Sequence, residues 1–201
     1  MSITKKASPL QEAMRCGFVG REGTAYISEE AERAVHNSYS RYTSTQGREV
    51  MGVLVGERYY HGAQALPIWL ILGASLSSVG DERSAPVDMN ALNAAMRSAQ
   101  ELIERLDLPG VSFLGLWHSH PDGIGVPSYN RGTGDIGVAR NLLRSNSYLP
   151  DVLMAIAYHA YRGGESWLAF NTTVLLRNDQ RGFRYVPTAG ENEIRSLAPD
   201  R

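Results

Sequence analysis

The chain has 201 residues, of which 43% are hydrophobic and 20% are charged, and its formal net charge is −1. This length and composition suit one domain with a sizeable core, and the near-zero charge gives no reason to expect nucleic acid or an anionic membrane as a partner. Cys16 is the only cysteine, so an internal disulfide is excluded, and no segment approaches the roughly 20 apolar residues of a membrane span. We therefore expect a cytoplasmic protein.

The N-terminal part of the sequence predicts an arm, a strand and a helix. Residues 1–22 are mixed in character, with Pro9 and two glycines, and are expected to form a loose arm. Residues 24–27 predict a short strand. Ser28 then has the character of a helix N-cap, with glutamates in the first turn, and we expect the helix to fray in the polar run near Thr43.

The middle of the chain predicts two strands, a loop and a long helix. Apolar, β-branched runs over 49–56 and 66–73 are typical of buried strands. A mostly polar loop is expected over 75–88. Apolar residues then recur at three- and four-residue steps over 89–106, which is the clearest amphipathic helix in the sequence.

The C-terminal part predicts a strand over 111–120, a loop to Gly134, and a helix over 135–143 with Thr133 as its N-cap. Alternation on the first of these strands is expected to place four side chains on one face: Leu114, Leu116, His118 and His120. Further strands are predicted over 152–158, 167–176 and 183–186, with a turn at Gly163-Gly164 between the first two.

Several of these strands follow one another without an intervening helix, which favours antiparallel pairing. The expected fold class is therefore α+β, or mixed α/β, with a central, largely antiparallel sheet flanked by helices. One domain is expected over 23–187, between the arm of residues 1–22 and a polar C-terminal tail of residues 188–201.

Two histidines provide the main chemical signal. His118 and His120 lie at positions i and i+2 of one predicted strand, so both imidazoles project from the same face and can reach one ion at about 2 Å. Pro121 ends the strand there, and glycines in the following loop allow it to fold back over the site. The pattern predicts a metal site, with polar strand histidines as the alternative interpretation.

A catalytic zinc ion takes three protein ligands and leaves one position for water. Asp135, in the first turn of the following helix, is our choice for the third ligand, although an aspartate there also simply complements the helix dipole. Asp122 is closer in sequence and remains an alternative.

Metal-bound water needs a base that takes its proton and delivers it to the leaving amine. Glu49 is the candidate, because it lies at the edge of an otherwise apolar strand; the alternative is a solvated glutamate. Ser128 is a candidate for hydrogen bonding to the oxyanion of a tetrahedral intermediate, or else a turn serine after Pro127.

Together these residues resemble the JAMM (MPN-plus) metalloprotease family. Glu49 begins Glu-Val-Met-Gly-Val-Leu-Val-Gly, His118-Ser119-His120-Pro121 follows, and Ser128 lies at the family's spacing from His120. The resemblance covers about residues 23–178 and implies an MPN-type single domain. It also implies one Zn²⁺ per chain, held by His118, His120 and an aspartate, with Glu49 and Ser128 as catalytic residues.

One position departs from the family pattern. Arg131 stands three residues after Ser128, where the family has its ligand aspartate. Either the loop is four residues longer, with Gly132-Thr133-Gly134 delivering Asp135 to that place, or the third ligand is lost. We favour the longer loop, because residues 131–134 are glycine-rich and Asp135 still opens a predicted helix.

The resemblance implies hydrolysis of a peptide or isopeptide bond after the C-terminal tail of a ubiquitin-like protein, in deconjugation or maturation. Its expected partners are that protein or its conjugates and other components of a conjugation system, with no nucleic acid and no membrane. By analogy with stand-alone prokaryotic members, such a system can serve antiviral defence.

Two other interpretations remain. The first is a catalytically silent MPN domain that acts as a scaffold or partner-binding module, which Arg131 favours. The second is a metallo-β-lactamase-type hydrolase that uses His118, His120 and Asp122; Gly123 disfavours it, because that pattern needs a histidine there. His159, on a predicted strand, is interpreted as structural.

Overall fold

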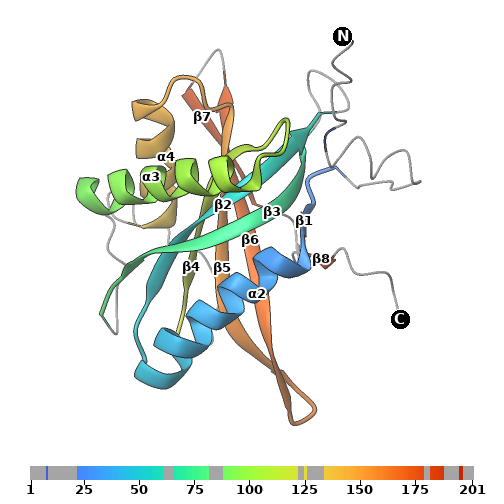
Figure 1. Cartoon of the computed structure of the whole chain (residues 1–201), viewed down its shortest axis with the longest axis vertical. Helices are drawn as coiled ribbons and strands as arrows, with labels where there is room; N and C mark the ends of the chain where they lie inside the picture. Colours follow the sequence, from blue (N-terminus) through green and yellow to red (C-terminus); the bar gives the residue numbers. More distant parts are fainter. Residues whose placement is uncertain are drawn as a thin grey trace.

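The structure, a computed structural model, describes residues 8, 22–60, 66–81, 88–121, 125, 134–178, 182–187 and 195–196. Its helices are α2 (Glu29–Ser38), a π-helix η1 (Tyr39–Ser44), α3 (Met89–Leu106) and α4 (Asp135–Ser145). Its strands are β1 (Ala25–Ile27), β2 (Val50–Tyr59), β3 (Ile68–Val79), β4 (Ser112–Ser119), β5 (Asp151–Arg162), β6 (Glu165–Asn178), β7 (Gly182–Pro187) and β8 (Arg195–Ser196). Figure 1 shows their arrangement.

The described strands form one mixed sheet in the order β7-β6-β5-β4-β2-β3-β1-β8. Strands that follow one another without a helix between them pair antiparallel, as expected: β2 with β3, β5 with β6, and β6 with β7. β2 and β4 are also antiparallel, whereas β4–β5, β1–β3 and β1–β8 are parallel. The mixed α/β class is confirmed, and most of the strand pairing is antiparallel.

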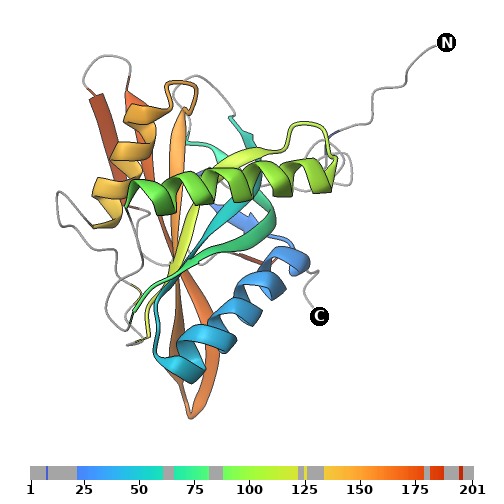
Figure 2. The ribbon, with the colours of Figure 1, turned by 60° about the vertical axis from the view of Figure 1, so that its left-hand side comes forward.

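Helices cover both faces of the sheet. Apolar residues of α3 and α4 pack with one set of strand residues, and those of α2 and η1 pack with another. We call these the α3/α4 face and the α2 face. Figures 1 and 2 show α3 lying across the strands and α2 well apart from it. In the described part of the chain, no helix is both long and apolar enough to cross a membrane.

The helix ends follow local chemistry. Ser28 caps α2, its Oγ accepting a hydrogen bond from the Ala31 amide at 3.3 Å. α3 spans the predicted residues 89–106 and is capped by Asp88. The predicted cap of α4 is wrong: the N-cap is Gly134, which has no side chain to contribute, and Thr133 lies outside the described residues.

The helix that was expected to fray near Thr43 instead continues as the π-helix η1. Tyr39 and Thr43 are both buried in it, at 2% and 3% exposure. Tertiary contacts of these two side chains, described below, stabilise a turn that the polar local sequence does not predict. π-Helical turns are rare and often lie at functional sites.

The polar loop predicted over 75–88 is wrong for its first part, because β3 continues to Val79 and pairs with β2. The polarity of the segment does not break the strand, since the hydroxyls of Ser75 and Ser77 find partners across it. Ser77 Oγ donates to the Met51 carbonyl at 3.0 Å, and Ser75 Oγ lies 2.9 Å from Ser98 Oγ on α3.

The face predicted for β4 is also partly wrong. Leu116 packs on the α3/α4 face, but Leu114 packs on the α2 face. The register between β2 and β4 shifts at this point: Leu54 lies opposite Gly115, and Val55 lies opposite Phe113. Leu114 is the extra residue of a β-bulge, which reverses the alternation of side chains.

Near the C-terminus, the predicted turn at Gly163-Gly164 is confirmed, with both glycines at positive φ. The segment expected to be a frayed tail contains β8, which pairs in parallel with β1.

A polar network lies where β5 begins. Asp151 is fully buried, and its carboxylate accepts hydrogen bonds from Tyr60 at 2.6 Å and Trp69 at 3.2 Å. Arg58 Nε lies 3.3 Å from the same carboxylate, and its guanidinium also donates to Ser112 and to the Phe113 carbonyl. Burial, and then the negative charge of Asp151, raise the pKa of Tyr60 well above its ordinary value of 10.0.

Candidate metal centre

Glu49, His118 and His120 lie at the end of the sheet where β4 ends and β2 begins. Met51 on β2 lies directly opposite His118 on β4, so the two side chains share a face of the sheet. Met51 packs in the core of the α3/α4 face. Continuing the register by two residues places Glu49 opposite His120 on that same face. The backbone therefore supports a shared face for Glu49, His118 and His120.

Asp135 reaches this face from the first turn of α4. His118 and Asp135 are both buried, at 7% exposure each. The Nε2 atom of His118 lies 2.8 Å from Oδ1 of Asp135. Yet this nitrogen makes no hydrogen bond to any described residue, so the carboxylate lies beside the ring nitrogen and not along its N–H direction. A buried ring nitrogen without a hydrogen bond costs free energy unless a ligand occupies it.

His120 lies just beyond β4 and is half-buried. Its ring packs edge-on against the His118 ring, with 4.7 Å between ring centroids. Its backbone is held on two sides: the amide donates to the Ala157 carbonyl at 2.9 Å, and the Tyr39 hydroxyl donates to the His120 carbonyl at 3.3 Å. The main chain at His120 is therefore fixed by both β5 and η1.

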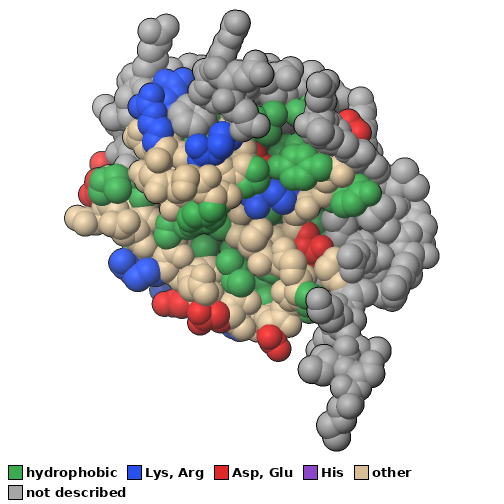
Figure 3. All heavy atoms as spheres, turned by 90° about the horizontal axis from the view of Figure 1, so that it is seen from above, with side chains coloured by type: hydrophobic (Ala, Val, Ile, Leu, Met, Phe, Trp, Pro, Cys, Tyr) green, Lys and Arg blue, Asp and Glu red, His purple; other side chains and the backbone are tan. Residues whose placement is uncertain are grey.

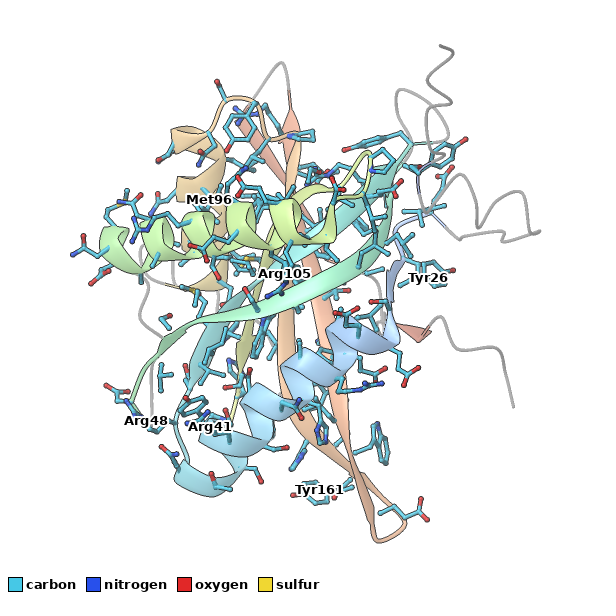
Figure 4. The ribbon with its side chains drawn as sticks, viewed as in Figure 1. Tyr26, Arg41, Arg48, Met96, Arg105 and Tyr161 are labelled. Atoms are coloured by element: carbon cyan, nitrogen blue, oxygen red, sulfur yellow. The ribbon has the colours of Figure 1, made fainter. Side chains whose placement is uncertain are left out.

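Glu49 is half-buried and precedes β2 by one residue. Its amide donates to the Asp81 carbonyl, and its carbonyl accepts from the Gly80 amide, both at 2.8 Å. In Figure 4 the neighbouring Arg48 side chain lies at the end of the molecule where β2 begins. Arg48 donates from Nε to the Gly80 carbonyl at 2.7 Å, so the chain entering β2 is tied to the end of β3.

The remaining candidate residues belong to the segment that follows His120 in the sequence. Asp122, Ser128 and Arg131 lie outside the described residues. Within the described ranges, no three His, Cys, Asp or Glu side chains are grouped closely enough to hold a metal ion as they stand. His118 Nε2 and Asp135 Oδ1 are in contact, and the His120 ring contacts the His118 ring.

Gly52, the first glycine of the motif that Glu49 begins, shapes this centre. A Cβ on Gly52 would lie 2.0 Å from the Ser75 carbonyl oxygen and 2.2 Å from Nε1 of Trp117. Glycine at that position lets the Trp117 indole cross β2 and donate to the Ser75 carbonyl at 3.3 Å. Trp117 immediately precedes His118, so this packing fixes the strand that carries the histidines.

The loop after His120 is anchored at one described point, Gly125. The Asn171 side-chain amide donates to the Gly125 carbonyl, and a Cβ on Gly125 would lie 2.3 Å from the Tyr158 ring. The loop therefore meets β5 and β6 at this residue, at a contact that only glycine fits without rearrangement.

Imidazole and carboxylate are both ligand types that zinc accepts. Imidazole nitrogen and carboxylate oxygen bind zinc at about 2.0–2.2 Å, so two ligands of one tetrahedral ion lie about 3.3 Å apart. The observed separation of 2.8 Å between His118 Nε2 and Asp135 Oδ1 is about half an ångström shorter than this. A modest outward shift of either side chain would admit the ion.

Comparisons with protein-family models and with curated proteins give no match. Among solved structures, the chain is similar to the solution structure of protein DSY2949 from Desulfitobacterium hafniense, a Northeast Structural Genomics Consortium target. The two share 14% sequence identity with a TM-score of 0.38, over 80% of this chain and 89% of that chain. A similarity of this size carries no argument about function.

Proposed function

We propose that the chain is a JAMM-type zinc peptidase or isopeptidase with an MPN-type fold. The observation that carries the proposal is the buried contact between His118 and Asp135, in which the ring nitrogen makes no hydrogen bond to a described residue. A structural ion pair would direct the N–H at the carboxylate, whereas two ligands of one ion direct their donor atoms at the metal.

In this proposal His118, His120 and Asp135 hold one Zn²⁺. When bound, zinc supplies a water whose pKa is lowered to about 7. Glu49 takes the proton of the attacking water and delivers it to the leaving amine. Ser128 stabilises the oxyanion by hydrogen bonding. The burial of His118 and Asp135 strengthens their interaction with charge at the site, because water is excluded around them.

The proposed substrate is a ubiquitin-like protein or its conjugate, cleaved after its C-terminal tail. An extended tail would bind by adding to a sheet edge. β5 continues to Arg162, whereas its pairing with β4 ends at the register of Ser119 and Ala157. The proposed tail-binding edge therefore begins beside His120. Other components of a conjugation system are the further proposed partners.

Zinc analysis and cleavage assays on the full chain test the proposal. The probes are ubiquitin and prokaryotic ubiquitin-like proteins, each carrying a fluorogenic amine on its C-terminus. We expect near-stoichiometric zinc and cleavage of at least one probe. Glu49→Gln should abolish cleavage with zinc still bound, whereas the matched control Glu101→Gln, on the exposed side of α3, should behave as wild type. Loss of zinc from Glu49→Gln would instead make Glu49 a ligand.

A second candidate function is a silent MPN domain that binds a partner without cleaving it. Arg131 in place of the family's aspartate favours it, as does the finding that no three possible ligands among the described residues are grouped closely enough to hold a metal ion. Wild-type protein that takes up no zinc from a zinc-containing buffer would support this candidate and refute the peptidase. Asp135→Ala should weaken zinc binding more than Asp122→Ala, and the reverse order would make Asp122 the ligand.

A further inference from the structure

The π-helix η1 contacts the chain around the candidate centre from the α2 face, opposite the proposed ligands. Thr43 Oγ1 donates to the Arg48 carbonyl at 2.8 Å and lies 2.6 Å from Ser119 Oγ. Ser119 Oγ in turn accepts from the Val50 amide at 3.0 Å. Both hydroxyls are buried, Ser119 completely and Thr43 at 3% exposure.

The chemistry at the two ends fixes the direction of this chain of hydrogen bonds. The Val50 amide can only donate, and the Arg48 carbonyl can only accept. Both ends are satisfied only when Ser119 donates its proton to Thr43 and Thr43 donates its proton to Arg48. Each hydroxyl then makes one donated and one accepted hydrogen bond, and neither can rotate without leaving a buried group unsatisfied.

The two ends of this chain are the peptide groups on either side of Glu49. The Arg48 carbonyl precedes Glu49 and the Val50 amide follows it. Together with the bonds of Glu49 itself to Gly80 and Asp81, every peptide group around the proposed base has a partner. Ser119 lies between the two proposed histidine ligands in the sequence. Its hydroxyl therefore joins the chain around Glu49 to β4, the strand that leads into both histidines.

Tyr39 adds a second contact from the same helix. It lies one residue after α2, and its hydroxyl donates to the His120 carbonyl at 3.3 Å. Its ring also packs on His159 of β5, with 4.8 Å between ring centroids. The π-helical turn thus presents Tyr39 and Thr43 together to the consecutive residues Ser119 and His120.

We infer that Tyr39, Thr43 and Ser119 are positioning residues, which hold Glu49 at a fixed separation from β4 and its histidines without touching substrate. This assignment rests on the proposed function. A base must lie within hydrogen-bond reach of the water that it deprotonates, and a displacement of about 1 Å at a catalytic group can cost about a hundredfold in rate.

The test compares hydroxyl-deleting with hydroxyl-keeping variants, using the cleavage assay above and zinc analysis. Thr43→Val keeps the shape of the side chain and removes its hydrogen bonds. We expect kcat to fall between about ten- and a hundredfold, with KM within about twofold and zinc still equimolar. Thr43→Ser should restore most of kcat. Thr45→Val is the matched control, because Thr45 also donates to a backbone carbonyl, that of Arg41, but is exposed.

Tyr39→Phe is the second variant, since it deletes one hydroxyl and leaves the packing of the ring on His159. We expect a smaller fall in kcat with KM unchanged, and no effect from Tyr42→Phe. Equal activity of Thr43→Val and wild type would overturn the assignment, as would equal losses in Thr43→Val and Thr43→Ser. Wild type that binds no zinc or cleaves no probe would overturn the proposed function, and this assignment with it.

Discussion

The contact between His118 and Asp135 can be tested by changing one atom. Asp135→Asn keeps the size of the side chain and removes its charge. Both side chains are 7% exposed, and the ring nitrogen lies 2.8 Å from the carboxylate without a hydrogen bond to any described residue. The effect of the substitution depends on whether His118 and Asp135 form a structural ion pair or bind one shared metal ion.

The two interpretations differ by several kcal/mol. Removing one partner of a buried, structural ion pair costs about 3–5 kcal/mol. For a pair arranged for a metal, we expect the metal-free protein to lose less than about 1 kcal/mol, because no hydrogen bond is broken at Nε2. Zinc at about 1,000 times its Kd should stabilise wild type by about 4.1 kcal/mol. If the substitution weakens zinc a hundredfold, this stabilisation falls to about 1.4 kcal/mol.

Urea unfolding measures both quantities, once with a chelator and once with zinc. Asp107→Asn is the control, since Asp107 is exposed at a left-handed position where asparagine is also accepted, and it should match wild type within about 0.5 kcal/mol. A loss of about 3 kcal/mol or more in the chelated protein, together with no zinc stabilisation of wild type, would identify a structural ion pair and refute the metal interpretation.

Two further predictions concern the surrounding fold. Burial and Asp151 raise the pKa of Tyr60, so the folded state favours the neutral phenol. The contribution of Tyr60 to the stability of the fold is therefore complete below pH 10 and is lost as the pH rises above 10. The free-energy difference between wild type and Tyr60→Phe should therefore shrink in unfolding measurements above pH 10, and a constant difference would contradict the coupling. Gly52→Ala places a Cβ within 2.2 Å of both the Ser75 carbonyl oxygen and Trp117, so we expect a loss of about 3 kcal/mol or more by urea unfolding; a loss below about 1 kcal/mol would contradict that packing.

Local patterns predicted the elements that depend on local chemistry. The helix over 89–106 follows from apolar periodicity, Ser28 caps α2 through its own hydroxyl, and Gly163-Gly164 makes the hairpin turn. The errors lie where distant strands decide the outcome. The polar residues 75–79 are strand because β2 pairs with them, and Leu114 changes face because the β2–β4 register shifts there.

The same distinction between local and long-range signals applies to the candidate site. A short motif suggested His118 and His120, and Asp135 was chosen because it opens the next helix; the structure brings Asp135 to His118. Ser119 and Thr43 carry no sequence signal, because their contact joins residues 76 positions apart through a π-helix that local propensity does not predict.

The antiparallel contact of β2 with β4 also orders how the centre can assemble. His118, His120 and Asp135 belong to one continuous segment that runs from β4 into α4, whereas Glu49 joins them from a strand about 70 residues earlier in the chain. Short loops close faster and at lower entropic cost than long ones. If the proposed ligands are correct, a folding chain can bind its metal ion before β2 pairs with β4. The chain can then hydrolyse a substrate only after that pairing, because the pairing brings in Glu49. A chain that has bound metal but has not finished folding would then be unable to cleave other proteins around it.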